Sequence, residues 1–387
     1  MTFSKACIYG AGAIGGWIGA RLAQQPGVEL SVVARGATLE ALQQHGLRLH
    51  MASGAGVSAA AAPATPLCAS VKTSAQPADL GVQDLVVIAV KAPALAEITQ
   101  HIAPLIGPHT VVLTAMNGVP WWFLQGFGGA HANTPLASVD PQGRIAQAIP
   151  AQHLIGCVVH ASCSLRGPAE VQHHFGNGLI IGEPSGVVTE RVQALHALLQ
   201  NAGFDATLSP HIQKDTWYKL WGNMTVNPVS ALTGATTDRI LDDDLVRGFI
   251  SAVMLEAKEI GARIGIPIDQ QPEDRHAVTR KLGAFRTSML QDVDAGKPVE
   301  LDALVAAVRE LGQLTGVATP FTDALLGLSR LQAQTLGIRG VYQGGAAEGA
   351  FSQYGQVVHP AVVGAHITPA NNDQIGRRPL QVVRSTL

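Results

Sequence analysis

A lysine and two asparagines recur at four-residue spacing in the middle of the chain. Lys219, Asn223 and Asn227 lie within the segment 217–228, which ends in an Asn-Pro pair. On an α-helix, residues four positions apart fall on one face. An ammonium and two amides on one face can hold a polar anion and deliver a proton to its carbonyl oxygen. An amphipathic helix whose polar side chains simply face water is the alternative interpretation.

A second chemical signal stands at the start of the chain, where glycines follow a short apolar run. The run 6–9 feeds Gly10-Ala11-Gly12-Ala13-Ile14-Gly15, and a helical pattern follows from Trp17. A glycine fingerprint between a strand and a helix is typical of a dinucleotide site, because the backbone can approach a pyrophosphate at the helix start. The predicted cofactor-binding residues here are Gly10, Gly12, Ala13, Ile14 and Gly15.

The end of the next predicted strand, 29–34, favours NADP over NAD. NAD-binding proteins usually carry an acidic residue there, which bonds the ribose hydroxyls. This chain has Ala34-Arg35-Gly36 instead. A guanidinium at Arg35 suits the 2′-phosphate of NADPH. A solvent-facing arginine is the alternative.

Six motifs in this order resemble the ketopantoate reductase (2-dehydropantoate 2-reductase) family, over roughly residues 5 to 335. They are the glycine fingerprint, Val90-Lys91-Ala92, Met116-Asn117-Gly118, the Trp217 to Pro228 segment, Thr287-Ser288-Met289-Leu290-Gln291-Asp292 and Glu300-Leu301-Asp302.

The resemblance implies NADPH-dependent reduction of a 2-oxo acid to a 2-hydroxy acid, in a cleft between a Rossmann domain and a helical domain. The expected reaction is 2-dehydropantoate to pantoate, in pantothenate biosynthesis. It implies that Lys219 donates the proton and that Glu300 bonds the substrate's hydroxyl groups. The remaining residues it implies are Asn117, Asn223, Asn227 and Ser288 around substrate and cofactor, and Lys91 near the cofactor.

Physical chemistry is compatible with these roles. Hydride addition leaves negative charge on the substrate oxygen, which a nearby ammonium stabilises and protonates. Glu300 follows Pro298 near a predicted helix start, where the helix dipole favours an ionised carboxylate. The alternatives are a surface lysine at Lys219, a charge that stabilises a helix end at Glu300, and a local helix cap at Ser288.

The pattern of elements predicts an α/β fold: an N-terminal Rossmann-type dinucleotide-binding domain with an antiparallel sheet extension, then an all-helical C-terminal domain. Apolar strands are expected at 84–90 and 110–114, with short β-rich runs between 137 and 182. The predicted domains are 1–207 and 208–338, followed by a tail of unknown role at 339–387. The predicted helical runs are 211–227, 241–264, 274–294 and 299–315, with Pro228 as a break.

Two features leave the identity of the substrate open. Some members of the family place a further asparagine where this chain has Thr237, so one substrate contact is expected to differ. Trp121 and Trp122 stand beside a glycine-rich stretch and could form a lid over the cleft, or pack a loop to the surface. A bulkier or aromatic 2-oxo acid is therefore an alternative substrate, and a non-catalytic NADP sensor is an alternative of another class.

Composition sets the remaining expectations. A net charge of −2 and a pI near 6.7 give no electrostatic case for nucleic acid or an anionic membrane. Four cysteines without paired spacing predict reduced thiols, and no signal peptide is readable, so a cytoplasmic protein is expected. No histidine or cysteine spacing predicts a metal site. The expected partner is a small-molecule substrate, and the helical region could offer a surface for a homodimer.

Overall fold

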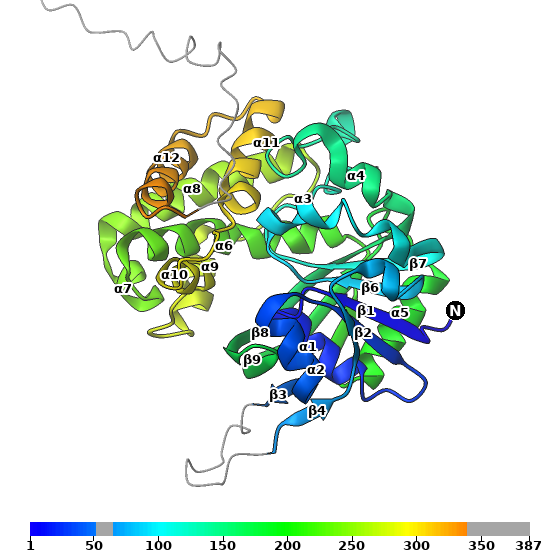
Figure 1. Ribbon diagram of the computed structural model, residues 1–387. Coiled ribbons are helices and arrows are strands. Elements are labelled where there is room, and N and C mark those ends of the chain that lie inside the picture. Colours follow the sequence, from blue (N-terminus) through cyan, green and yellow to red (C-terminus); the bar gives the residue numbers. More distant parts are fainter. Residues whose placement is uncertain (52–64, 339–387) are drawn as a thin grey trace, which may run out of the picture. The chain divides into compact units, whose positions relative to one another are not determined.

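A computed structural model describes residues 1–51 and 65–338, and these belong to one compact unit (Figure 1). The predicted tail at 339–387 lies outside the described residues. Within the unit, a mixed β-sheet is followed along the chain by a group of helices. The expected fold class, a Rossmann-type region followed by a helical region, is confirmed.

The strands of the described residues all lie before residue 209, with helices between them. They are β1 (Lys5–Tyr9), β2 (Glu29–Val33), β3 (Leu47–His50), β4 (Leu67–Ala69), β5 (Lys72–Ser74), β6 (Gln83–Ile88), β7 (Ile106–Ala115), β8 (Leu154–Gly167), β9 (Glu170–Gly182) and β10 (Asp205–Leu208).

These strands form one ten-stranded sheet in the order β4-β3-β9-β8-β7-β6-β1-β2-β5, with β10 beside β9. The pairs from β5 through β2, β1, β6 and β7 to β8 are all parallel, as in a dinucleotide-binding fold. The long hairpin of β8 and β9 is antiparallel. The predicted antiparallel extension of the sheet is therefore confirmed.

Alternation along the strands gives the sheet two apolar faces. In β1, Ile8 packs in a cluster with Trp17 and Leu195, which come from the helices on one face. Its neighbour Tyr9 packs in a second cluster with Trp122, on the other face. The central parallel strands are thus covered on both sides, which explains their continuous apolar sequence.

The helices fall into those that cover the sheet and those that form a core of their own. The first group is α1 (Ala13–Leu22), α2 (Gly36–His45), α3 (Leu95–Ile98), α4 (Arg144–Ala148) and α5 (Glu190–Asn201). The second group is α6 (Ile212–Thr233), α7 (Thr237–Asp242), α8 (Asp244–Arg263), α9 (Pro272–Arg280), α10 (Ser288–Asp294), the π-helical turn η7 (Asp302–Ala306), α11 (Ala307–Thr315) and α12 (Pro320–Thr335).

Helix α6 passes through the centre of the second core, and it does not break where the sequence predicted. It runs on to Thr233, with Pro228 inside it and buried. Proline removes one backbone hydrogen bond, but tertiary packing supplies most of the stability of a helix in a protein. Trp217, Trp221 and Met224 of α6 are all within the second core, so packing holds the helix through the proline.

Two further helical expectations needed correction. The run 274–294 is two helices, because Gly283 adopts a positive φ of 61° between α9 and α10. Each has its own N-terminal cap: Gln271 with Asp274 for α9, and Thr287 for α10. Helix α12 was not predicted. Among the described residues, no helix combines the length and apolar character needed to cross a membrane.

The segment between β7 and β8 joins the sheet to the second group of helices. The carboxylate of Glu310 in α11 accepts hydrogen bonds from the backbone amides of Ala137 and Ser138 at 2.7 and 2.8 Å. It also accepts one from the Ser138 hydroxyl, at 2.5 Å. Near the start of the segment, the amide of Val119 donates to the carbonyl of Ala303 at 2.8 Å. This segment therefore forms a fixed wall between the two regions.

Candidate active site

The glycine fingerprint folds into a cradle that side chains could not occupy. Gly10 has φ +101°, and a Cβ on it would lie 2.4 Å from the side chain of Val90. A Cβ on Gly15 would lie 2.0 Å from the carbonyl oxygen of Gly10. At Gly12, by contrast, a Cβ would meet nothing within 4 Å. The backbone is thus tightly packed at the first and third glycines and open at the second, which fits a pyrophosphate.

The amino end of α1 completes this cradle. Gly12 is the N-cap residue, and no side chain caps the helix. Ala13 and Ile14 are the first two helical residues, and their amides belong to the group of amides at a helix start that lack a partner within the helix. Uncapped amides at a helix start are suited to binding an anionic group. The residues present therefore fit a dinucleotide.

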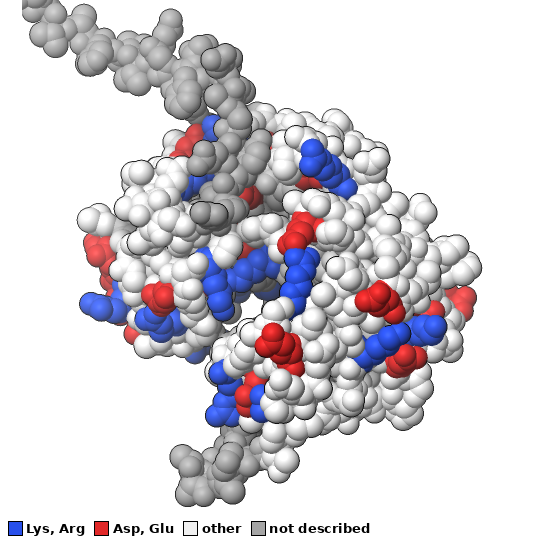
Figure 2. Space-filling view, viewed as in Figure 1, with Lys and Arg blue, Asp and Glu red and all other residues white. Residues whose placement is uncertain are grey.

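Arg35 lies directly after β2, where the sequence placed it. It is the N-cap residue of α2 and about half exposed. Its guanidinium forms an ion pair with the carboxylate of Glu97, from α3. On the face shown in Figure 2, lysine and arginine side chains gather around the hollow in the middle of that face. A cationic rim of this kind suits an anionic ligand.

Lys91 comes soon after β6, at the start of the short 3-10 helix η2 (Ala92–Ala94). Its ammonium forms an ion pair with the carboxylate of Asp292 from α10. Burial raises the pKa of Asp292, an effect that the hydrogen bond and charge of Lys91 oppose. Asp292 was not assigned a role from the sequence, although it closes the Thr287 to Asp292 motif. The pair links the sheet region to the helical region.

Lys219 occupies the centre of the candidate site. Its ammonium donates to Asn117 Oδ1 and to the Val159 carbonyl oxygen, both at 2.7 Å. Burial is the main cause that lowers the pKa of Lys219 to about 8, and the positive charge of Arg275 acts in the same direction, whereas interactions with Cys157 and Glu300 oppose the shift. An ammonium has three donors, so the third remains for another acceptor.

Glu300 lies just before Leu301, the N-cap of η7, so it is near a helix start as expected. The shift of its pKa is the opposite of the expectation. Burial raises the pKa of Glu300, and this outweighs the amide of Ala92 and the charges of Lys91 and Lys219, which lower it. The amide of Ala92 donates to Glu300 Oε1 at 3.3 Å. The helix dipole therefore does not dominate, because the carboxylate is removed from water.

The remaining predicted residues divide by position. Asn223 lines a small space beside Lys219, together with Asn117. Asn227 is buried one turn further along α6. Ser288 is exposed at the first position of α10, and the cap of that helix is Thr287, whose hydroxyl accepts from the Leu290 amide. The alternative of Ser288 as the helix cap is therefore wrong.

The space beside Lys219 is narrow. It has a volume of about 10 Å³, which is at the lower limit for one water molecule. This space therefore has room for about one water molecule.

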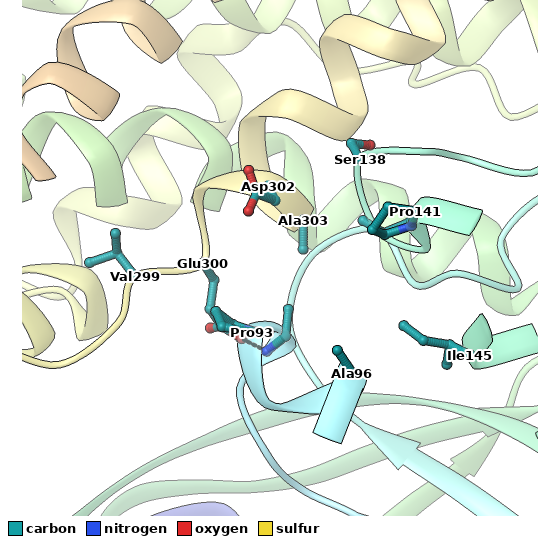
Figure 3. A pocket seen from close by; sticks show the side chains of 11 residues that line it. Pro93, Ala96, Ser138, Pro141, Ile145, Val299, Glu300, Asp302 and Ala303 are labelled. Carbon is teal, nitrogen blue, oxygen red and sulfur yellow. Dashed lines mark hydrogen bonds between the residues drawn. The ribbon is translucent and has the colours of Figure 1, made fainter. Parts of the chain in front are cut away.

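A larger cavity of about 260 Å³ opens next to Glu300 (Figure 3). Its walls come from the start of α3, from the segment between β7 and β8, and from the residues around η7. Most of its lining is apolar, and Glu300 projects toward Pro93 at its edge. The residues that line it are Ala92, Pro93, Ala96, Ser138, Val139, Pro141, Ile145, Val299, Glu300, Asp302 and Ala303.

Trp121, Trp122 and Thr237, which left the identity of the substrate undecided in the sequence, have packing roles in the structure. Trp121 and Trp122 are 5% and 1% exposed, and the indole of Trp122 donates to the Thr114 hydroxyl at 3.2 Å. Thr237 is 1% exposed and donates to the Gly283 carbonyl at 2.6 Å. The aromatic pair is therefore part of the core rather than a lid.

Other reactive groups do not assemble into a second centre. In the described part of the chain, no three His, Cys, Asp or Glu residues come together to hold a metal ion. Burial raises the pKa of the Cys157 thiol to about 12, so it stays protonated and weakly nucleophilic near neutral pH.

Comparisons with known proteins identify the family. The family model described as ketopantoate reductase PanE/ApbA matches residues 6–186, and its C-terminal counterpart matches residues 211–333. The chain belongs to the ketopantoate reductase family. It is an oxidoreductase, and its cofactor class is a nicotinamide dinucleotide.

Individual relatives agree with this family. A 2-dehydropantoate 2-reductase of Mesorhizobium japonicum is 43% identical over 326 residues, which are 84% of this chain and 97% of the relative. A crystal structure of a candidate ketopantoate reductase from Ralstonia solanacearum MolK2 is 54% identical, with a TM-score of 0.80, over 87% of this chain and all of the other. D-mandelate dehydrogenase shares the fold at 20% identity, with a TM-score of 0.72 over 87% of this chain and all of the other.

Proposed function

We propose that this protein reduces 2-dehydropantoate to pantoate with NADPH. The observation that carries the proposal is the ammonium of Lys219, which Asn117 and Val159 hold by hydrogen bonds and whose pKa burial lowers to about 8. A protein that only senses a dinucleotide has no need of a proton donor in this position.

NADPH, rather than NADH, is supported by Arg35 at the carboxyl end of β2. No acidic residue occupies positions 34 to 36. A guanidinium there can form charge-assisted hydrogen bonds with a 2′-phosphate. In the structure the guanidinium forms an ion pair with Glu97.

NADPH, when bound, supplies a hydride to C2 of the oxo acid. As the carbonyl π bond breaks, its electron pair moves to the oxygen, and Lys219 donates a proton to that oxygen to complete the hydroxyl group. A lysine whose pKa is about 8 is protonated near neutral pH and gives up the proton readily. The bonds to Asn117 and Val159 fix the direction of the remaining N–H.

Glu300 and the amides complete the proposed site. An ionised Glu300 accepts hydrogen bonds from hydroxyl groups on the substrate, and its charge stabilises the protonated Lys219. Asn223 and Asn227 stand one and two turns from Lys219 on the same helix, and they are proposed to position the substrate with Ser288. The amide groups do not compete for the proton. Lys91 is proposed to lie near the cofactor.

The decisive experiment is NADPH oxidation by the purified protein with 2-dehydropantoate and with a panel of small, branched and aromatic 2-oxo acids. The Lys219→Ala variant serves as the control for turnover. We expect 2-dehydropantoate to be the best substrate and the variant to lose turnover while it still binds NADPH. Tight NADPH binding without turnover of any oxo acid would overturn the proposal in favour of a sensor.

A second candidate substrate is a bulkier 2-oxo acid, and one observation favours it. The apolar cavity of about 260 Å³ beside Glu300 could hold a branched or aromatic group. Turnover confined to the aromatic members of the panel would select this alternative. The reaction and the role of Lys219 would be the same.

Three further proposals accompany the function. We propose that residues 1–207 and 208–338 act as the cofactor and substrate domains, since the family models break between residues 186 and 211. We propose a cytoplasmic location, in keeping with four free cysteines. A homodimer is proposed as the assembly, which a sedimentation measurement tests.

A further inference from the structure

A half-buried arginine that no sequence motif marked lies close to Lys219. Arg275 is in α9, and its Nε is buried without a hydrogen-bond partner among the residues described. Within 1–51 and 65–338, no carboxylate forms an ion pair with the guanidinium of Arg275. Arg280 in the same helix, by contrast, forms an ion pair with Asp242. Arg275 is half-buried and its guanidinium interacts with Tyr218, but no carboxylate in the described part of the chain balances its charge, so an anion from outside the chain would stabilise it.

The position of the guanidinium is fixed by α6. It lies over the ring of Tyr218, 5.3 Å from the centroid, which is a cation–π contact. A Cβ at Gly222 would lie 2.7 Å from Nε and 3.0 Å from Nη2 of Arg275. Glycine at this position is therefore what allows the guanidinium to lie against the helix.

Gly222 also places the guanidinium on the side of α6 that carries the proton donor. Residues three and four positions apart on a helix are neighbours, so Gly222 adjoins Lys219, and Asn223 follows it directly. The charge of Arg275 also lowers the pKa of both Lys219 and His160, in keeping with this position beside α6.

The acidic groups near Lys219, His160 and Arg275 are not partners of Arg275. Glu300 raises the pKa of Lys219, and Asp215 raises the pKa of His160. The hydroxyl of Ser209 donates to Asp215, which is therefore engaged elsewhere. Tyr218 donates its hydroxyl to Gln270 at 2.7 Å.

We propose that Arg275 binds the carboxylate of the 2-oxo acid and so orients its C2 carbonyl toward Lys219. This inference rests on the proposed function. Every 2-oxo acid carries a carboxylate adjacent to the carbonyl that is reduced, and a guanidinium binds a carboxylate with two parallel hydrogen bonds. The site thus divides the substrate between two cations, with Arg275 for binding and Lys219 for proton transfer.

The test is steady-state kinetics and ligand binding with Arg275→Gln, and with Arg280→Gln as the matched control in the same helix. We expect the KM for 2-dehydropantoate to rise roughly 10- to 100-fold in Arg275→Gln, the loss typical of a hydrogen bond to a charged group. NADPH affinity should be unchanged and the melting temperature should not fall, and added guanidinium ion should restore part of the lost affinity. Arg280→Gln should have the KM of the wild type.

Calorimetric titration of oxalate into the protein with NADPH bound separates the failure of this inference from failure of the proposed function. Oxalate carries a carboxylate but cannot be reduced as an oxo acid. Oxalate binding that is lost in Arg275→Gln supports the anion site even if no oxo acid is turned over. Equal turnover, or equal oxalate binding, in Arg275→Gln and the wild-type protein would overturn the inference. A wild-type protein that binds neither oxalate nor an oxo acid would also overturn it.

Discussion

At the residue scale, the central finding is a half-buried lysine whose pKa is set by its surroundings. Lys219 is held by one side-chain oxygen and one backbone oxygen at equal distances of 2.7 Å. Desolvation is the largest influence on its pKa, and Arg275 acts in the same direction. Both favour the neutral amine, so the ammonium is a stronger acid than a lysine in water.

This acidity predicts a pH dependence. Because the proton donor must be protonated, kcat/KM for reduction should fall as pH rises through about 8, the pKa of Lys219. The measurement is kcat/KM between roughly pH 6 and pH 10. Arg275→Gln removes a positive charge, so the fall in kcat/KM should occur at a higher pH than in the wild-type protein. A fall that stays at the pH of the wild type would argue against the electrostatic coupling of the two cations.

Arg35 and Glu97 give a second prediction at this scale. Arg35→Ala should weaken NADPH binding roughly 10-fold or more, because a charge-assisted bond to the 2′-phosphate is lost, and should leave NADH binding nearly unchanged. Glu97→Gln should tighten NADPH binding, since it releases the guanidinium from its present ion pair. Titration of both dinucleotides checks this, and equal losses for NADPH and NADH in Arg35→Ala would contradict it.

At the scale of elements, helix α1 depends on close contact with the turn before it. Gly15→Ala places a methyl group 2.0 Å from the Gly10 carbonyl oxygen. Backbone cannot move away as a flexible side chain can, so the free energy of unfolding should fall by about 1–3 kcal/mol. Dinucleotide binding should weaken as well.

The matched control is Gly248→Ala in the second turn of α8. A Cβ there meets nothing within 4 Å, so the same substitution should stabilise the protein by roughly 0.5–1 kcal/mol, because alanine is the better helix former. Urea unfolding curves measure both variants. Equal effects of the same sign would show that helix propensity, rather than the contact with Gly10, controls position 15.

At the scale of the whole molecule, the segment between β7 and β8 ties the helical region to the sheet. Glu310→Ala leaves the amides of Ala137 and Ser138 and the hydroxyl of Ser138 without their acceptor. The free energy of unfolding should fall by about 1–3 kcal/mol, the cost of leaving polar groups unsatisfied.

Glu259→Ala is the control for this prediction. Glu259 forms an exposed ion pair with Arg263 one turn away, which contributes about 0.5 kcal/mol or less. Thermal unfolding compares the two variants. If Glu310→Ala lowers the melting temperature no more than Glu259→Ala, then the segment is not a structural tie between the regions.

The sequence by itself determined the features that depend on local order. The glycine fingerprint between a strand and a helix, the parallel strands with an apolar face on each side, and the helical second region follow from periodicity and turn chemistry. The spacing of Lys219, Asn223 and Asn227 placed them along one helix. These are short-range properties, and the structure confirms the fold that they predict.

Only the tertiary structure decided what depends on residues far apart in the chain. Tertiary packing allows α6 to continue past Pro228. Burial raises the pKa of Glu300, whereas the sequence predicted that the helix dipole would favour its ionised form. Asp292 pairs with Lys91, and Arg275 lies over Tyr218 next to Lys219. Both contacts join residues far apart in the chain, and neither has a signal in local sequence. Desolvation and charge pairing are set by three-dimensional neighbours, so the electrostatics of the site could not be derived before those neighbours were known.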